Sequence, residues 1–250
     1  MLYAIMSDVH ANPWALEKAL EDARGRGAAK FICLGDVVGY GPDAQGAVKL
    51  AREAFDAVLM GNHDAATVGL ISSWNFRPEA KAGVFRHGLE LDAEALTWLK
   101  GLPHVHRESG FAAVHGSLAR PEEFEYIMTE GAALEAFGLM EEDRPLLFVG
   151  HTHTSLAVRR RGPRSVDVFD PDELTLAEGE RFILNVGSVG YPRNEAESVY
   201  ALWDPDTRTV VWRRLPFDYA DYAARMDARG VALPDWFGEN AAEAARGQGR

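Results

Sequence analysis

Five short polar motifs, each placed directly after an apolar run, constrain this chain of 250 residues more than any other feature. The runs predict β-strands, because short apolar stretches bounded by polar residues or glycine are typical of buried strands. The runs are Leu2–Met6, Phe31–Leu34, Ala57–Met60, Phe111–Val114 and Leu146–Val149. The motifs after them are Asp8-Val9-His10, Gly35-Asp36, Gly61-Asn62-His63-Asp64, His115-Gly116 and Gly150-His151-Thr152-His153.

The spacing of the first three runs favours a parallel α/β sheet. Pro13 to Arg24 and Asp43 to Phe55 separate these runs and have the pattern of amphipathic helices, with Asn12 as a candidate cap of the first. In an open α/β sheet, ligands bind beyond the carboxyl ends of parallel strands. We therefore expect all five motifs to deliver their side chains to one sheet edge, where they could share metal ions.

Residues 65–110 interrupt this rhythm. The pattern predicts two helices here, Pro78–His87 and Asp92–Leu99, beside the Asn62-His63-Asp64 loop. The segment fits a lid, a dimer face or plain packing against the core. Its large aromatic residues fit a dimer face, and hence an oligomer, as well as a core; they are Trp74, Phe76 and Trp98.

The second half has more β character. Further strands are expected at Phe182–Val186, Val199–Trp203 and Thr209–Arg213, and a closing helix at Phe217–Arg229. A hairpin around Gly162-Pro163 carries the basic cluster Arg159, Arg160, Arg161 and Arg164, which fits a solvated turn or a local phosphate or partner contact. Because no linker is visible, residues 1–250 are expected to form a single domain, and Glu239–Arg250 a tail that frays.

Composition excludes several classes of protein. With 47% hydrophobic residues the chain can bury one large core, and no apolar run has the length of a membrane-spanning helix. No signal peptide is expected, so the cytoplasm is the default location. The single cysteine, Cys33, lies in an apolar run and is expected to be buried. A net charge of −12 argues against non-specific nucleic-acid binding, since such a surface repels a polyanion.

The motifs together offer two carboxylates, several imidazoles and one amide, which is a donor set for divalent metals. Two cations held roughly 4 Å apart need a shared carboxylate, and Asp36 is the natural bridge. Two divalent cations, two aspartates and a bridging hydroxide sum to about +1, so the site would attract a phosphate ester even on an acidic protein.

His63 is the expected exception among the motif histidines. It lies between Asn62 and Asp64, and a neighbouring carboxylate can orient an imidazole and favour its protonated form. His63 is therefore the candidate general acid for a leaving alkoxide. His87, His104 and His106 lack the pattern and are expected to be surface or structural residues.

This set of motifs, in this order from Asp8 to His153, resembles the calcineurin-like metallophosphoesterases. The stretch from Gly187 to Arg193 is similar to a segment of the small prokaryotic phosphodiesterase-like members. The resemblance implies a four-layer α/β/β/α sandwich of two mixed sheets flanked by helices. It also implies two divalent ions, of manganese, iron, zinc, nickel or cobalt.

The resemblance assigns residues to each metal. One metal is implied at Asp8, His10, Asp36 and His153, and the other at Asp36, Asn62, His115 and His151. It also implies that His63 is the acid/base residue, supported by Asp64. Asn12 and Tyr40 lie near these positions in sequence; each could contact substrate, or cap a helix and pack a loop respectively.

Two departures from the family pattern are informative. Phosphoprotein phosphatases and dinucleoside tetraphosphate hydrolases carry a phosphate-gripping arginine in the second motif, and the stretch Gly35 to Gly41 has none. The absence weakens the phosphoprotein phosphatase interpretation. Ala11 stands where related chains often have glycine, which matters only if this position requires a positive φ.

The leading hypothesis is therefore a phosphodiesterase that acts on a nucleotide or another small phosphate ester through a metal-bridging hydroxide. A phosphomonoesterase with the same site is the close alternative. A non-catalytic metal-binding scaffold is the alternative from a different class, although all seven expected ligands and His63 are present.

Overall fold

Two six-stranded mixed sheets pack face to face in the computed structural model, which describes residues 1–170, 172–193, 195–234 and 236–247. The first sheet has the order β3-β2-β1-β11-β12-β9. Its strands are β1 (Tyr3–Met6), β2 (Lys30–Cys33), β3 (Ala57–Val58), β9 (Glu173–Thr175), β11 (Glu197–Asp204) and β12 (Thr209–Pro216). The second has the order β4-β5-β6-β10-β7-β8. Its strands are β4 (Val105–Glu108), β5 (Phe111–Val114), β6 (Leu146–Val149), β7 (Ser155–Gly162), β8 (Ser165–Phe169) and β10 (Phe182–Val186).

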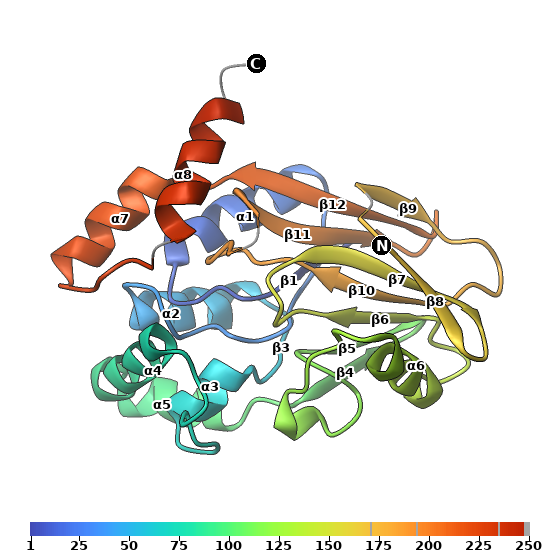
Figure 1. Ribbon diagram of the computed structural model, residues 1–250, viewed down its shortest axis with the longest axis horizontal. Coiled ribbons are helices and arrows are strands. Elements are labelled where there is room, and N and C mark those ends of the chain that lie inside the picture. The colour runs from blue at the N-terminus through green and yellow to red at the C-terminus, as the bar shows by residue number, and fades with distance from the viewer. Residues whose placement is uncertain (171, 194, 235, 248–250) are drawn as a thin grey trace.

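Helices flank this pair of sheets, and Figure 1 shows α2 to α5 on the side of β3 and α6 below β5 and β6. The helices are α1 (Pro13–Gly25), α2 (Ala44–Ala54), α3 (Asn62–Thr67), α4 (Pro78–Glu90), α5 (Ala93–Lys100), α6 (Glu130–Leu139), α7 (Tyr219–Ala228) and α8 (Trp236–Gly247), with a short 3₁₀ turn at Pro121–Glu123. The four-layer sandwich implied by the family resemblance is thus confirmed.

The core explains why the motif-bearing strands are apolar throughout. In β1, Ala4 and Met6 pack under the helices while Ile5 faces the other sheet. In β5, Phe111 and Ala113 likewise face the first sheet, whereas the alternate residues pack on α6. A strand buried on both faces needs apolar side chains at every position, so it shows no alternation in its sequence.

The prediction of one sheet edge was wrong. β1, β2 and β3 are parallel neighbours in the first sheet, whereas β5 and β6 are parallel neighbours in the second. The motifs nevertheless meet, because the two sheets pack with the carboxyl ends of these strands together. Sequence periodicity does not distinguish one buried parallel sheet from two.

Other elements follow the sequence expectations with small differences. Asp92, the first residue of the predicted helix Asp92–Leu99, caps α5 by accepting a hydrogen bond from the backbone amide of Ala95. The hairpin of β7 and β8 forms, and Arg159 and Arg161 both pair with Asp167 across it, which favours the solvated-turn interpretation of the basic cluster. Cys33 is buried as expected.

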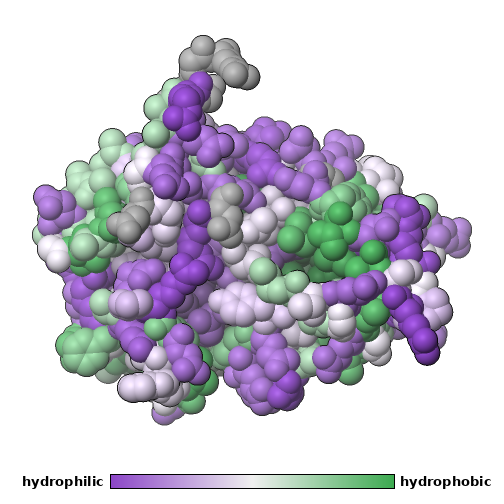
Figure 2. All heavy atoms as spheres, viewed as in Figure 1, coloured by the Kyte–Doolittle hydropathy of each residue, from purple (hydrophilic) through white to green (hydrophobic). Residues whose placement is uncertain are grey.

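The end of the chain is more regular than its composition suggested. The stretch expected to fray, Glu239–Arg250, belongs to α8 as far as Gly247, and its last three residues lie outside the described part. None of the helices in the described ranges combines the length and apolar character needed to cross a membrane. The visible face is mostly hydrophilic, with a hydrophobic patch right of centre, near β7, and further hydrophobic atoms at its left edge and lower left (Figure 2).

Candidate metal centre

Seven buried side chains with metal-binding groups meet where the strands of the two sheets end. They are the residues expected from sequence: Asp8, His10, Asp36, Asn62, His115, His151 and His153, none more than 8% exposed. Three groups have ligand atoms within 4.8 Å of one another: Asp8 with His10 and His153, His10 with Asp36 and His63, and Asp36 with His115 and His151. Asp36 belongs to two of these groups, as the predicted bridge requires.

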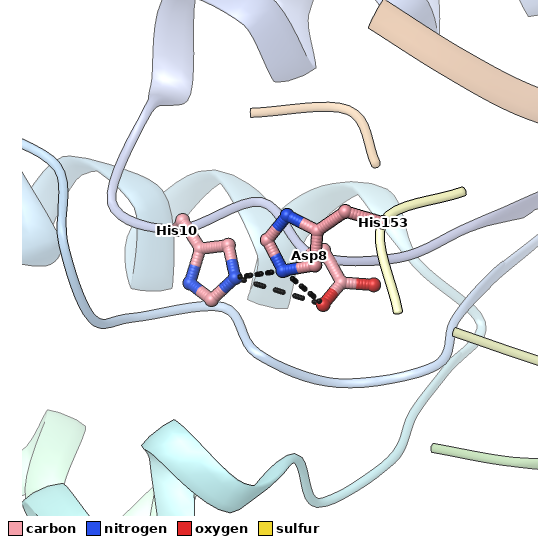
Figure 3. Close-up of side chains that lie close together, drawn as sticks. All are labelled: Asp8, His10 and His153. Atoms are coloured by element: carbon pink, nitrogen blue, oxygen red, sulfur yellow. Dashed lines mark hydrogen bonds and ion pairs between the residues drawn. The ribbon is translucent and has the colours of Figure 1, made fainter. Parts of the chain in front are cut away.

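The first group has a compact geometry, shown in Figure 3. The Nε2 atoms of His10 and His153 lie 3.0 Å apart. The Oδ1 atom of Asp8 is 3.1 Å from the Nε2 of His153 and 3.6 Å from that of His10. Three ligand-type atoms therefore point at one small region.

Backbone contacts fix which ring nitrogen faces this region. The Nδ1 of His10 lies 3.0 Å from the carbonyl of Val38, and that of His153 lies 2.6 Å from the carbonyl of Tyr191. Because a carbonyl only accepts, each neutral ring carries its proton on Nδ1 and turns the Nε2 lone pair to the site. Two facing lone pairs beside the Oδ1 of Asp8, which has no hydrogen-bond partner among the described residues, repel one another unless a cation lies between them.

The group of Asp36, His115 and His151 has a similar arrangement. The Nδ1 of His115 lies 3.1 Å from the carbonyl of Leu34, so its Nε2 is directed inward. That Nε2 is 3.3 Å from Oδ2 of Asp36 and 3.2 Å from Oδ1 of Asn62. The same Oδ2 of Asp36 lies 3.7 Å from the Nε2 of His10. One carboxylate oxygen thus stands between a histidine of each group.

The protonation equilibria show how strongly the site attracts positive charge. Burial alone would raise the pKa of the Asp8 and Asp36 carboxyls, yet the adjacent His153 and His115 hold both pKa values well below the usual range. Burial would likewise lower the pKa of His115, but Asp36 raises it to about 9. Without a metal, a proton on His115 balances part of the buried negative charge, and a divalent cation can replace it.

The backbone at the ligand positions is unusual. Five of the seven ligand-type residues have a positive φ: Asp8 (55°), His10 (48°), Asp36 (52°), His151 (68°) and His153 (60°). This left-handed conformation costs a residue other than glycine about 1 kcal/mol or more. Its concentration here shows that the packed loops hold these side chains in place against local preference.

Ala11 shares this conformation, with φ of 52°, and is fully buried. A positive φ is the condition under which alanine in place of glycine affects the backbone energy, and Ala11 meets it. A glycine would adopt the same backbone at lower cost.

His63 lies beside the ligand groups at the start of α3. Its backbone amide donates to Oδ1 of Asp36 at 2.8 Å, and its ring packs 4.6 Å from Tyr40 and 5.0 Å from Phe76 between centroids. Burial lowers its pKa well below the usual range, although the charge of Asp36 opposes that shift. The ring is therefore neutral in the metal-free chain.

The predicted support of His63 by Asp64 needs correction. The two oxygens of Asp64 accept from the backbone amides of Val38 at 3.0 Å and Gly61 at 3.1 Å. No hydrogen bond joins Asp64 to His63 within the described ranges. The motif begins a helix instead of forming a plain loop, so adjacent side chains point in different directions and Asp64 caps α3.

Asn12 and Tyr40, the two candidate substrate-binding residues, have different surroundings in the structure. Asn12 accepts from the amide of Ala15 and donates to the carbonyl of Gly190, so it caps α1 and ties two loops together. Tyr40 lines the cavity beside the metal ligands and stacks on Tyr191 at 4.2 Å between centroids. The capping interpretation therefore holds for Asn12, and only Tyr40 borders the cavity.

This cavity has a volume of about 520 Å³ and opens onto Asn62, His63 and His151. Its walls come largely from residues that the motifs did not indicate: Ile71, Phe76, Phe124, Tyr126 and Arg193. Tyr126 stacks on His151 at 3.8 Å between centroids. Segment 65–110 thus contributes a wall of the cavity, while Trp98 packs against the core and Trp74 is 79% exposed.

His87, expected from the sequence to be a surface or structural residue, has a structural role. It is buried, accepts a hydrogen bond from the amide of Gly39, and lies 3.0 Å from the carbonyl of Gly41. Burial lowers its pKa to about 3, so it stays neutral and holds the loop that follows Asp36. Only the absence of a motif around it distinguished His87 in the sequence.

Comparison with known proteins identifies the family of this chain. Residues 1–208 fit the model of the calcineurin-like phosphoesterase superfamily domain. The chain belongs to this superfamily. The resemblance drawn from the motifs is thereby confirmed.

Individual relatives extend over nearly the whole chain. A metallophosphoesterase from Sphaerobacter thermophilus, of known structure, is 36% identical, with a TM-score of 0.83 over 98% of this chain and 99% of that one. An uncharacterized protein of Methanocaldococcus jannaschii is 28% identical over 95% of this chain and 96% of its own length. A hypothetical protein from Pyrococcus horikoshii OT3 shares the fold, with a TM-score of 0.69 at 19% identity over 94% of this chain and 95% of its own.

We predict that Asp36→Ala removes both metals together, because its carboxylate contacts histidines of both ligand groups. Elemental analysis after loading with Mn²⁺ measures the stoichiometry. Asp143→Ala, which removes an exposed carboxylate, serves as the control and should bind metal like the parent chain. Retention of two full-occupancy ions by Asp36→Ala would contradict the bridging role.

Gly61→Ala should disrupt the same carboxylate without removing it. A Cβ at Gly61 would lie 2.1 Å from Oδ1 of Asp36, and the resulting shifts cost about 1–3 kcal/mol. The control is Gly138→Ala in α6, where nothing lies within 4 Å of the new Cβ. Thermal unfolding and metal titration of both variants should show loss only for Gly61→Ala; equal behaviour would show that the close approach is unimportant.

Proposed function

We propose that this protein is a dinuclear metal-dependent phosphoesterase that hydrolyses small phosphate esters, with phosphodiesters as its preferred substrates. One observation supports this proposal most strongly: the inward-facing Nε2 atoms of His10, His115 and His153 converge with the carboxylates of Asp8 and Asp36. Buried groups of this kind need cations. Membership of the phosphoesterase superfamily supports the reaction class.

The donor set divides naturally around Asp36. Asp8, His10 and His153 with Asp36 would hold one ion, and Asn62, His115 and His151 with Asp36 the other. The mixed nitrogen and oxygen ligands suit manganese, iron, zinc, nickel or cobalt, and manganese is the ion with which to begin tests. When bound, such ions act as Lewis acids on phosphoryl oxygens and lower the pKa of coordinated water.

His63 has the position expected of a proton donor to the leaving oxygen. It borders the cavity next to Asn62, and its ring is held by Tyr40 and Phe76. Burial favours its neutral form, but an anionic phosphate ester beside the ring would raise its pKa and favour protonation. We propose that His63 transfers a proton to the departing alkoxide, and that Asp64 acts indirectly by capping α3.

The cavity favours an ester with sizeable organic groups, and we place diesters first because a diester carries two such groups and a monoester only one. A volume of about 520 Å³ exceeds what a phosphate group alone requires, and Phe76, Phe124 and Tyr126 give it aromatic walls. An organic group on the phosphate can pack against these rings, as a nucleoside or another planar substituent would. A phosphomonoesterase using the same residues is the alternative.

We predict that Mn²⁺-loaded protein cleaves bis-p-nitrophenyl phosphate with higher kcat/KM than p-nitrophenyl phosphate, and that metal-stripped protein cleaves neither. Release of p-nitrophenolate gives both rates. A strong preference for the monoester would replace the diesterase assignment with the alternative. Two bound metals without cleavage of a wider panel of nucleotide diesters would favour a non-catalytic metal-binding scaffold.

His63→Ala should reduce kcat about 10²- to 10⁴-fold, as expected for loss of a positioned acid, while both metals stay bound. Its control is His106→Ala, which changes a histidine on β4 that pairs with Glu108. Metal content and turnover measured on the same preparations separate the two roles. Loss of a metal from His63→Ala would make His63 a ligand, since its ring also lies close to His10 and Asp36.

A further inference from the structure

Arg193 is the feature of the metal-site cavity that the proposed mechanism leaves unused. Its side chain lines this cavity together with Asn62, His63 and His151. Its Nε is buried without a hydrogen-bond partner among the described residues. Its Nη2 donates a long hydrogen bond, at 3.4 Å, to the carbonyl of His151, and its side chain also hydrogen-bonds that of Tyr126. A guanidinium has five N–H donors, so most of its capacity is left for another acceptor.

Arg193 also lacks a counter-ion. Within the described ranges, no carboxylate lies within ion-pair distance of its guanidinium, whereas the comparably shielded Arg213 and Arg214 pair with Asp22 and Glu195. Its charge opposes the rise that burial causes in the pKa of Tyr126, so it acts on the cavity wall. In a chain with net charge −12, a partly buried cation without an acidic partner has a site for an anion beside it.

The backbone around Arg193 is held from two sides. The amide of Asn240, on α8, donates to the carbonyls of Pro192 at 3.0 Å and Arg193 at 3.2 Å. The carbonyl of Tyr191 accepts from Nδ1 of the metal-ligand candidate His153. The backbone that carries the Arg193 side chain is therefore anchored next to a residue that orients a metal-ligand candidate, which reduces the entropy lost when the side chain binds an anion.

We propose that Arg193 is a substrate-binding residue whose guanidinium donates to the non-bridging oxygens of the phosphate held at the metal centre. This inference rests on the proposed function and adds a specific phosphate contact to it. A planar guanidinium matches two phosphate oxygens at once, which a lysine does not. Arg193 and His63 line one cavity, and the organic groups of the ester would contact its aromatic walls.

The test compares three variants of the Mn²⁺-loaded full-length chain: Arg193→Ala, Arg193→Lys and, as a control, Arg164→Ala. Arg164→Ala removes the same charge from the exposed β7–β8 turn. Calorimetry measures the affinity for inorganic phosphate, steady-state kinetics measure kcat and KM for bis-p-nitrophenyl phosphate, and elemental analysis measures metal content.

The expected result for Arg193→Ala is a loss of about 10- to 100-fold in phosphate affinity and in kcat/KM, with both metals retained. Arg193→Lys should recover part of both losses, and Arg164→Ala should leave both unchanged. Phosphate affinity equal to that of the parent chain would overturn the proposal. Loss of metal from both Arg193 variants would also overturn it, because Arg193 would then only hold the loop of His151.

Phosphate affinity keeps this outcome separate from failure of the proposed function. If the parent chain cleaves no ester, the enzyme assignment fails, but calorimetry still reports whether Arg193 contributes to phosphate binding. If the parent chain is active and Arg193→Ala binds phosphate normally, only the inference about Arg193 fails.

Discussion

Three short contacts between histidine Nδ1 atoms and backbone carbonyls determine the rest of this site. Val38, Leu34 and Tyr191 supply the carbonyls for His10, His115 and His153. Each contact fixes the direction of a ring, so each Nε2 atom faces the carboxylates of Asp8 or Asp36. The acceptors come from the loops after β2 in the first sheet and β10 in the second, so these side chains are oriented only when both sheets are assembled.

The loops that hold the ligand-type residues have an energetically unfavourable backbone conformation. A positive φ at five ligand-type residues and at Ala11, together with two buried carboxylates, is unfavourable unless the surroundings compensate. Compensation comes from close packing: Gly61 approaches Asp36 so closely that a Cβ would lie 2.1 Å from its Oδ1, and Gly150 similarly approaches Ser7. The strands that precede these loops are buried in the core, and their packing fixes the ends of the loops. The conformation of these loops is therefore required by packing as well as by the chemistry of the site.

The meeting of the motif side chains could be predicted from the sequence because each motif follows a strand, and a strand end is a fixed position in an α/β fold. The strands Phe111–Val114, Leu146–Val149 and Phe182–Val186 have the same bounds in the structure. The division into two sheets could not be predicted from periodicity, because strands buried on both faces have no alternation. The role of Asp64 was misassigned because adjacency in sequence does not give the direction of a side chain at a helix start. Tyr126 reaches the cavity from a segment that no local pattern marks, and the stretch from Gly187 to Arg193, although similar to a family segment, did not by itself place Arg193 at the cavity.

The distribution of charge explains how an acidic chain can recognise an anion. The net charge of −12 is spread over a surface on which most arginines pair with carboxylates, whereas the buried Asp8 and Asp36 carboxylates lie among histidines that could hold cations. Asp36 raises the pKa of His115 to about 9, which shows that even a proton is held strongly at this position. Two divalent ions would reverse the local sign, and Arg193 would add a further positive charge on the cavity wall. Because exposed charges beyond about 10 Å are screened by salt, the local field at the centre outweighs the acidic surface for a bound phosphate.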